Sequence, residues 1–302
     1  MKKMTVGNHL EASRIALGCM RFGALDQKSA GRHIETAMEA GIDFFDHADI
    51  YMQGYSEELF GLVFDHSRRD QVLIQSKCGI RKGYYDFSRE HILSSVEGSL
   101  KRLRTEYLDV LVLHRPDTLM EGEEVAAAFD ALHSSGKVRC FGVSNFHPGQ
   151  IEYLKKYVKQ PLLVNQLQLG VTHTGMIDSG LNVNMKNTNS IDHDSGVLEY
   201  SRLHDMTIQA WSPFRHTKES GVVIGNPLVP EVNACLEKYA LIYDVSPSAV
   251  VIAWLLRHPA GIQPILGTTN TARLLDLCNA DDVEMSREAW YEIYRSAGNL
   301  IP

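Results

Sequence analysis

Four side chains in the first half of the sequence have the chemical types that proton transfer to a carbonyl oxygen requires. They are a carboxylate, a phenol, an ammonium and an imidazole, at Asp46, Tyr51, Lys77 and His114. A free phenol has a pKa of about 10 and gives up its proton reluctantly near neutral pH. A neighbouring ammonium lowers that pKa, and a carboxylate keeps the ammonium charged and aimed. We therefore expect Tyr51 to be a general acid tuned by Lys77 and Asp46. His114 would hydrogen-bond the substrate oxygen and orient it.

The same residues stand at the ends of runs that are typical of buried parallel strands. Asp46 ends the apolar run 42–46, Lys77 ends the run 72–77, and His114 follows the run 108–113. Near-continuous apolar runs suit parallel strands that are covered on both faces. The sequence predicts eight such strands, at 14–18, 42–46, 72–77, 108–113, 138–143, 162–167, 206–210 and 262–266.

Helical patterns separate these strands. Ile92, Val96 and Leu100 lie on one apolar stripe, and Ser88 is placed to cap its start. Strand and helix that alternate eight times predict an α/β fold, a (β/α)8 TIM barrel with two extra helices and long βα loops. A doubly wound open sheet is the main alternative, but it usually carries G-x-G-x-x-G after its first strand, and this sequence does not. We expect a single barrel domain over residues 1–302.

Polar residues also stand at the ends of three further strands. Ser144 and Asn145 follow the fifth strand, Gln166 lies near the end of the sixth, and Trp211 with Ser212 ends the seventh. In a parallel barrel the carboxyl ends of the strands converge on one rim, where active sites are built. Any one of these residues alone would more often serve packing or a turn. The series over six consecutive strands predicts an active site on this rim.

The overall composition excludes several classes of protein. The chain has 302 residues, a net charge of −7 and a pI near 6, so a nucleic-acid partner has no electrostatic support. No stretch approaches the roughly 18 apolar residues that span a bilayer, and the N-terminus lacks the apolar region of a signal peptide. Five cysteines, an odd number without a C-x-x-C pair, are typical of reduced thiols. We expect a cytoplasmic protein without a membrane partner.

The chain resembles the aldo-keto reductase family from about residue 13 to the C-terminus. The resemblance rests on FFDHADIY with GYSEELFG, QSKCG, YLDVLVLHRPD, SGKVRCFGVSNF, VNQLQLG, AWSPF and PILGTTNTARLLD. The first of these segments carry the family's catalytic tetrad onto Asp46, Tyr51, Lys77 and His114. The overall pattern resembles the compact bacterial general oxidoreductases. The resemblance implies NADP(H)-dependent reduction of aldehydes or ketones to alcohols by hydride transfer.

The resemblance also implies where NADPH would bind. Ser144, Asn145 and Gln166 match the positions that hydrogen-bond the nicotinamide carboxamide, and Trp211 matches the aromatic residue that stacks on the nicotinamide ring. The pyrophosphate would run along Ser212, Pro213 and Phe214, and the adenosine 2′-phosphate would lie near Gly267, Thr268, Thr269 and Arg273. Many family members carry Lys where Gly267 stands. NADPH is still expected to be preferred over NADH, because a guanidinium such as that of Arg273 suits phosphate.

The sequence is compatible with three other functions. A cofactor-binding regulatory or redox-sensing subunit would share the fold, although an intact tetrad argues for chemistry. Lys77 could form a Schiff base, but Asp46 should keep it protonated. His47, Asp49 and His114 could bind a metal, but the H-x-D spacing is loose and later strands supply no second histidine cluster. We expect no metal site.

The substrate pocket is predicted from residues near the same rim. Two long loops, 172–195 and 212–228, interrupt the alternation of strand and helix, and long loops inside compact domains are often functional. The expected partner is a small carbonyl compound. We expect it to meet the first loop together with Met20, Arg21, Tyr55, Tyr84, Tyr85, Phe87 and Phe214.

Overall fold

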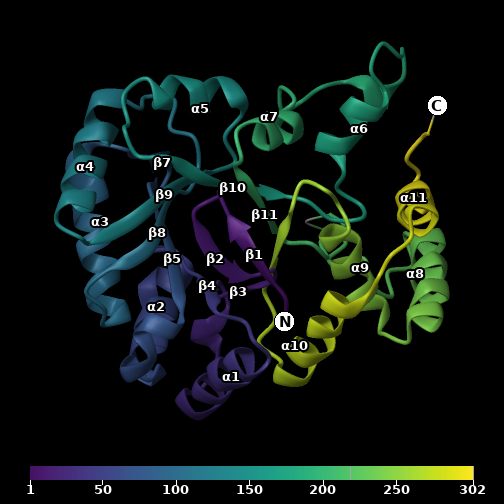
Figure 1. The fold of residues 1–302 in the computed structure, drawn as a ribbon, viewed down its shortest axis with the longest axis horizontal. Coiled ribbons are helices and arrows are strands. Elements are labelled where there is room, and N and C mark those ends of the chain that lie inside the picture. The colour runs from purple at the N-terminus through teal and green to yellow at the C-terminus, as the bar shows by residue number, and fades with distance from the viewer. Residues whose placement is uncertain (218, 302) are drawn as a thin grey trace.

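The computed structural model describes residues 1–217 and 219–301, which form a closed barrel of eight parallel strands surrounded by helices (Figure 1). The (β/α)8 barrel expected from the sequence is confirmed. Around the barrel the strands are β3 (Ala16–Gly18), β4 (Phe44–Asp46), β5 (Leu73–Cys78), β8 (Leu108–Leu113), β9 (Val138–Ser144), β10 (Leu162–Gln168), β11 (Thr207–Trp211) and β12 (Gln263–Leu266). Their register pairs Gly18 with Asp46, Cys78 with Leu113 and Gln166 with Ser144, so the strand ends meet at one rim.

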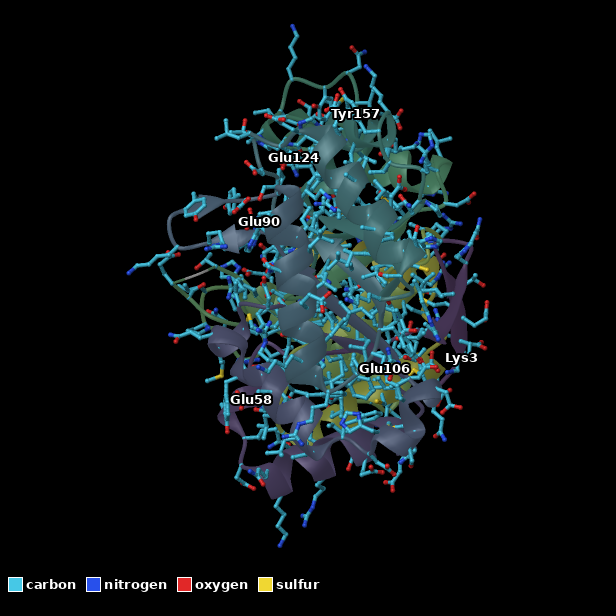
Figure 2. All side chains as sticks on the ribbon, turned by 90° about the vertical axis from the view of Figure 1, so that its left-hand side faces the viewer. Lys3, Glu58, Glu90, Glu106, Glu124 and Tyr157 are labelled. Carbon is cyan, nitrogen blue, oxygen red and sulfur yellow. The ribbon has the colours of Figure 1, made fainter. Side chains whose placement is uncertain are left out.

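Several of the helices begin at a capping side chain, and glycine follows the end of some of them. In α1, the Asp26 side chain accepts a hydrogen bond from the Ser29 N–H, Ala30 and Ile34 face the core, and Gly41 follows at φ +85°. Ser88 caps α3 as expected. The helices are α1 (Gln27–Glu39), α2 (Tyr55–Val63), α3 (Arg89–Leu103), α4 (Gly122–Ser134), α5 (Pro148–Lys155), α6 (Gly175–Leu181), α7 (Val197–Leu203), α8 (Pro230–Tyr243), α9 (Pro247–Leu256), α10 (Thr271–Cys278) and α11 (Arg287–Ser296). Their outer faces carry charge, as Glu58 of α2 and Glu90 of α3 show in Figure 2.

A hairpin that the sequence did not predict covers the end of the barrel opposite the rim. It consists of β1 (Lys3–Val6) and β2 (Leu10–Ser13). Val6 and Ala12 from this hairpin belong to the apolar cluster inside the barrel, together with Phe44 and Leu163. The hairpin therefore closes one end of the barrel interior, and the rim at the other end is left for binding.

The loop 172–195 follows β10, lies against the C-terminal segment and does not line the cavity at the rim. The Tyr294 hydroxyl of α11 donates to the Asp178 carboxylate at 2.6 Å, and the Asn299 amide donates to the Thr174 hydroxyl at 3.0 Å. Figure 1 shows α6 near α11 at one side of the molecule. These bonds fasten the loop to the last helix and to the segment after it, whereas Thr172, at the start of the loop, donates to the Arg215 carbonyl beside the cavity at 3.3 Å.

Within the described residues, no single helix is both long and apolar enough to cross a bilayer; α8 and α9 reach that length only as a pair, and the chain bends by 86° between them.

Candidate active site

The Lys77 side chain, at the end of β5, is the centre of the predicted tetrad. Its ammonium is fully buried and donates to the Asp46 carboxylate at 2.8 Å, the His47 carbonyl at 2.7 Å and the Tyr51 hydroxyl at 3.0 Å. An ammonium has three N–H donors, so all three are used. Burial favours the neutral amine, but the charge of Asp46 and the contact with Tyr51 outweigh it and raise the pKa of Lys77. Lys77 is therefore held as an ammonium, which disfavours a Schiff-base role.

The backbone of the loop after β4 places Tyr51 beside Lys77. The His47 N–H donates to the Gln75 carbonyl at 2.8 Å and the Asp49 N–H donates to the Lys77 carbonyl at 3.0 Å, which continue the pairing of β4 with β5. Tyr51 then begins a single helical turn, η2 (Tyr51–Gly54), in which Met52 and Gln53 adopt left-handed φ values of 49° and 58°. Non-glycine residues in this region carry strain, and such strain gathers at functional sites.

The ionisation of Tyr51 differs from the expectation drawn from the sequence. We expected Lys77 to lower the pKa of this phenol, and it does act in that direction. Burial of the side chain is the larger effect, however, and the Asp46 charge adds to it, so the pKa of Tyr51 is raised. The expectation was wrong because it weighed the ammonium without the depth of burial. Tyr51 therefore stays protonated at neutral pH, the form that a general acid needs.

His114 follows β8 and faces Tyr51 across the site. The two rings are 5.9 Å apart at an angle of 82°. Burial, with the charges of Lys77 and Arg115, lowers the pKa of His114 well below its usual value, so the imidazole is neutral. A neutral imidazole can donate one hydrogen bond and accept another, which suits contact with an uncharged oxygen.

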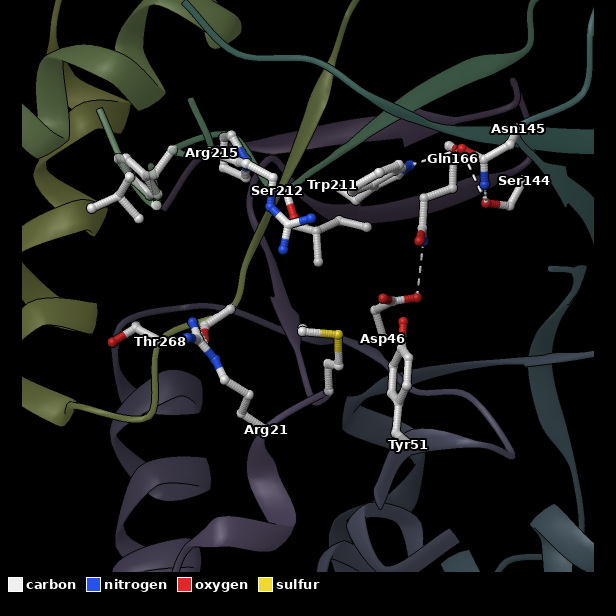
Figure 3. Close-up of a pocket in the computed structure, with 18 of the residues that line it drawn as sticks. Arg21, Asp46, Tyr51, Ser144, Asn145, Gln166, Trp211, Ser212, Arg215 and Thr268 are labelled. Atoms are coloured by element: carbon white, nitrogen blue, oxygen red, sulfur yellow. Dashed lines mark hydrogen bonds between the residues drawn. The ribbon is translucent and has the colours of Figure 1, made fainter. Parts of the chain in front are cut away.

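A cavity of about 1000 Å³ opens at the rim between these residues and the ends of β9 to β12 (Figure 3). This volume is at the upper end of the usual range for ligand pockets. Most of the predicted site residues line it: Asp46, Tyr51, His114, Ser144, Asn145, Gln166, Trp211, Ser212, Pro213, Phe214, Gly267, Thr268 and Arg273. Thr269 is not among the lining residues, and Lys77 lies behind Tyr51 and Asp46.

The substrate-pocket expectation is correct only in part. Met20, Arg21 and Phe214 line the cavity. The loop 172–195 does not line the cavity. Neither do four of the aromatic residues predicted to do so: Tyr55, Tyr84, Tyr85 and Phe87. Tyr84 and Tyr85 form the exposed strand β7 (Tyr84–Tyr85) of a short hairpin, and Phe87 is buried in the core. Sequence reasoning placed them near the rim but could not show which way each loop turns.

Hydrogen bonds brace the polar side chains at the end of the cavity nearest Tyr51. The Ser144 hydroxyl donates to the Gln166 carbonyl at 2.9 Å, and the Asn145 amide donates to the Ser144 hydroxyl at 2.7 Å. The Trp211 indole N–H donates to the Asn145 amide oxygen at 3.1 Å. Figure 3 shows these residues gathered on one side of the cavity, with Asp46 and Tyr51 facing them. These mutual hydrogen bonds hold the group in one arrangement.

The opposite end of the cavity carries positive charge. Arg273 stands in the first turn of α10 and Thr268 in the loop before it. The Arg21 guanidinium donates to the Gly267 carbonyl at 2.6 and 3.2 Å. Its Nη2 atom lies 3.6 Å from the position that a Cβ atom would occupy at residue 267. Arg21, which we had assigned to the substrate, thus supplies a cation where many family members carry Lys.

Arg115 is a lining residue that the sequence reasoning missed. It is half-buried next to His114, and its guanidinium lies 5.6 Å from the centre of the Trp211 ring. Its guanidinium forms no ion pair with any residue that the structure describes. The signal was present in the sequence, because Arg115 follows the predicted catalytic His114 directly.

The structure does not group His47, Asp49 and His114 as a metal site would require. Over residues 1–217 and 219–301, no three His, Cys, Asp or Glu side chains are grouped so that they could hold a metal ion. The His47 ring is fully buried and packs edge-on against Phe60 at 4.7 Å. His47 is therefore a core residue beneath the site.

Comparison with known proteins shows the family of the chain. The profile of the Aldo/keto reductase family matches residues 14–297. The chain is 35% identical to 6-dehydroglucose reductase of Agrobacterium fabrum over 98% of both chains, and 34% identical to Oxidoreductase YdhF of Escherichia coli over 95% of this chain and 94% of that one. An aldo-keto reductase of Klebsiella pneumoniae, solved with NADPH, has the same fold at a TM-score of 0.78 and 21% identity, over 98% of this chain and 95% of that one. The chain belongs to the aldo/keto reductase family.

Proposed function

We propose that the protein reduces the carbonyl group of a small aldehyde or ketone with NADPH, and that Tyr51 supplies the proton. The observation that carries the proposal is the 3.0 Å hydrogen bond from the buried Lys77 ammonium to the Tyr51 hydroxyl at the wall of the cavity. Family membership and the oxidoreductase names of the relatives support the reaction class.

The cavity has the donor set that a phosphorylated nicotinamide dinucleotide needs. Asn145 and Gln166 would hold the carboxamide, and Trp211 offers an aromatic face for the ring. Arg21 and Arg273 would hold phosphate at the other end. Both N–H donors of the Gln166 amide are used within the protein, on Asp46 and Gln209, so its oxygen is the group left to accept from a carboxamide. When bound, the reduced nicotinamide supplies the hydride.

The residues of the chain handle the proton. Tyr51, protonated because of burial, donates to the carbonyl oxygen as negative charge develops there. The phenolate that remains is held by the Lys77 ammonium, whose charge is balanced by Asp46. The neutral His114 imidazole lies on the other side of Tyr51 and would orient the same oxygen. Tyr51, Lys77 and His114 are thus each in the protonation state that this reaction requires.

Arg115 supports a polar substrate rich in hydroxyl groups. Its guanidinium lines the cavity near Trp211 without an anionic partner among the described residues, and a guanidinium has five N–H donors. The relative in Agrobacterium fabrum is named for 6-dehydroglucose, a carbonyl compound with several hydroxyl groups. We therefore place sugar-derived aldehydes first among the substrates.

The experiment that tests the proposal compares the wild-type protein with Tyr51→Phe. NADPH oxidation is followed with 4-nitrobenzaldehyde and with a sugar-derived aldehyde. The wild type should turn over, and Tyr51→Phe should lose about a hundredfold or more in kcat with nearly unchanged NADPH binding. Tight NADPH binding with no turnover on a broad carbonyl panel would instead favour the cofactor-binding regulatory or redox-sensing subunit.

A further inference from the structure

Four glutamine side chains form a continuous chain of hydrogen bonds through the barrel interior. They come from four strands: Gln75 from β5, Gln166 from β10, Gln209 from β11 and Gln263 from β12. Their exposed fractions are 3% for Gln166 and 0% for the other three. We call this set the amide ladder. It connects the catalytic carboxylate Asp46 with the opposite end of the barrel.

The bonds of the amide ladder run in a defined direction. The Gln263 amide donates to the Ser13 carbonyl at 2.8 Å and accepts from Gln209 at 2.9 Å. The Gln209 oxygen in turn accepts from Gln75 at 2.8 Å and from Gln166 at 3.2 Å. Because the Gln209 oxygen is a fixed acceptor, both neighbouring amides turn their nitrogens inward. This orientation leaves their second N–H free to point at Asp46.

Asp46 receives these N–H groups on one oxygen. Its Oδ1 accepts from Gln75 at 2.6 Å and from Gln166 at 3.0 Å, while Lys77 contacts both carboxylate oxygens at 2.7 and 2.8 Å. Asp46 is only 2% exposed, so water does not solvate its charge. A buried carboxylate needs such donors to remain ionised and in one orientation.

The amide oxygen of Gln75 contributes no hydrogen bond to the stability of the core. This oxygen is buried and has no hydrogen-bond partner among the described residues. An apolar side chain of the same shape would avoid that unsatisfied group, but it would also remove the two N–H donors that Gln75 directs at Asp46 and Gln209. The benefit of an amide at this position therefore lies in what it donates to.

We propose that Gln75 is a positioning residue for the reaction: by donating to Asp46 Oδ1 it fixes the carboxylate that aims the Lys77 ammonium at Tyr51. The inference rests on the proposed function for its catalytic consequence. Gln209 is the anchor that turns Gln75 toward Asp46. Gln263, at the far end of the amide ladder, touches neither Asp46 nor Lys77 and belongs to the barrel core.

The first test compares two substitutions that remove one amide each. Gln75→Met and Gln263→Met have the same change in shape and polarity, and both positions are fully buried. We expect Gln75→Met to lower kcat about tenfold or more while the KM for NADPH stays within about twofold. Gln263→Met should keep kcat within about twofold. Equal losses of kcat in the two variants, or a wild-type kcat in Gln75→Met, would overturn the proposal.

The second test keeps the shape of the side chain and replaces its amide by a titratable carboxyl group. In Gln75→Glu, burial and the nearby Asp46 charge raise the pKa of the introduced carboxyl. The protonated carboxyl can donate to Asp46, whereas the ionised one repels it. We expect the ratio of variant to wild-type kcat to rise about tenfold from pH 8 to pH 6. A ratio that stays constant while infrared spectroscopy shows the introduced carboxyl losing its proton would mean that Gln75 only fills space.

A crystal structure of Gln75→Met separates this inference from the proposed function. We expect the Asp46 carboxylate to rotate away from Lys77 or to occupy more than one orientation, whether or not the protein turns over. A single, unchanged Asp46 orientation would reject the positioning role. Absence of carbonyl reduction by the wild-type protein would instead count against the proposed function alone.

Discussion

The Lys77 ammonium lies 3.0 Å from the Tyr51 hydroxyl, and its other two N–H donors are bound to Asp46 and to the His47 carbonyl. A lysine in this setting cannot rotate toward solvent, because it is fully buried and every donor is occupied. One of its three N–H donors is therefore fixed on the Tyr51 hydroxyl, the oxygen that would carry the charge after proton transfer. Such preorganised charge is usually the largest single contribution to catalysis.

The contact between Lys77 and Tyr51 predicts the effect of Lys77→Met. Methionine keeps the unbranched shape and removes the charge, so the phenolate would form without its counter-ion. We expect kcat to fall on the order of a hundredfold, with NADPH affinity changed little, because Lys77 does not line the cavity. Stopped-flow measurement of NADPH oxidation provides the rates, and Lys101→Met on the exposed surface of α3 is the control. A loss no larger than that of the control would remove Lys77 from the mechanism.

The positive end of the cavity predicts cofactor preference. Arg273→Ala should raise the KM for NADPH about tenfold to a hundredfold and leave that for NADH within about threefold, because a charge-assisted contact with the 2′-phosphate is lost. Arg21→Ala should shift the preference in the same direction if its charge replaces the Lys found in relatives. Steady-state assays with both cofactors measure the ratio, with the exposed Arg287→Ala as control. Equal effects on NADPH and NADH would exclude a 2′-phosphate role.

Arg115 predicts substrate selectivity. Arg115→Met keeps most of the side-chain volume and removes the hydrogen-bond donors. We expect kcat/KM for a sugar-derived aldehyde to fall about tenfold or more, and that for 4-nitrobenzaldehyde to change less than threefold. The second substrate serves as the internal control, because it has a carbonyl group but no hydroxyl group. Parallel losses on the two substrates would show that Arg115 supports the site rather than the substrate.

The positions of the catalytic residues could be predicted from the sequence because two simple rules act together. Apolar runs identify parallel strands, and the carboxyl ends of such strands converge on one rim. Asp46, Lys77 and His114 follow from these rules, and the structure brings all three beside Tyr51. The rules need no knowledge of side-chain contacts.

Other features depend on the register of the strands and on how deeply a side chain is buried, and neither can be read from a single residue in the sequence. The amide ladder requires that Gln75, Gln209 and Gln263 face inward at matching heights, and the pairing of the strands decides this. The raised pKa of Tyr51 follows from its burial, and burial depends on loops from several parts of the chain. The loop 172–195 turns toward α11 because of contacts with Tyr294 and Asn299, more than a hundred residues away.

Asp49 predicts how stability depends on pH. Burial, reinforced by the charge of Glu57 and opposed by Arg102, raises the pKa of Asp49 from 3.8 to about 7 in the folded protein. As the pH rises from about 4, an unfolded chain loses this proton first, so the unfolded state binds fewer protons and stability falls until about pH 7. Above pH 7 both states are ionised at Asp49, and its contribution no longer changes.

Asp49→Asn should therefore stabilise the protein at pH 8 and have little effect at pH 4. Three pKa units at about 1.4 kcal/mol each set an upper limit of roughly 4 kcal/mol, and a gain of several degrees in Tm is expected. Thermal unfolding from pH 4 to pH 9 measures the difference, with Asp70→Asn as the exposed control. The gap between Asp49→Asn and wild type should open between pH 4 and pH 7 and then stay constant. A gap that is independent of pH would mean that Asp49 is ionised in the folded protein throughout this range.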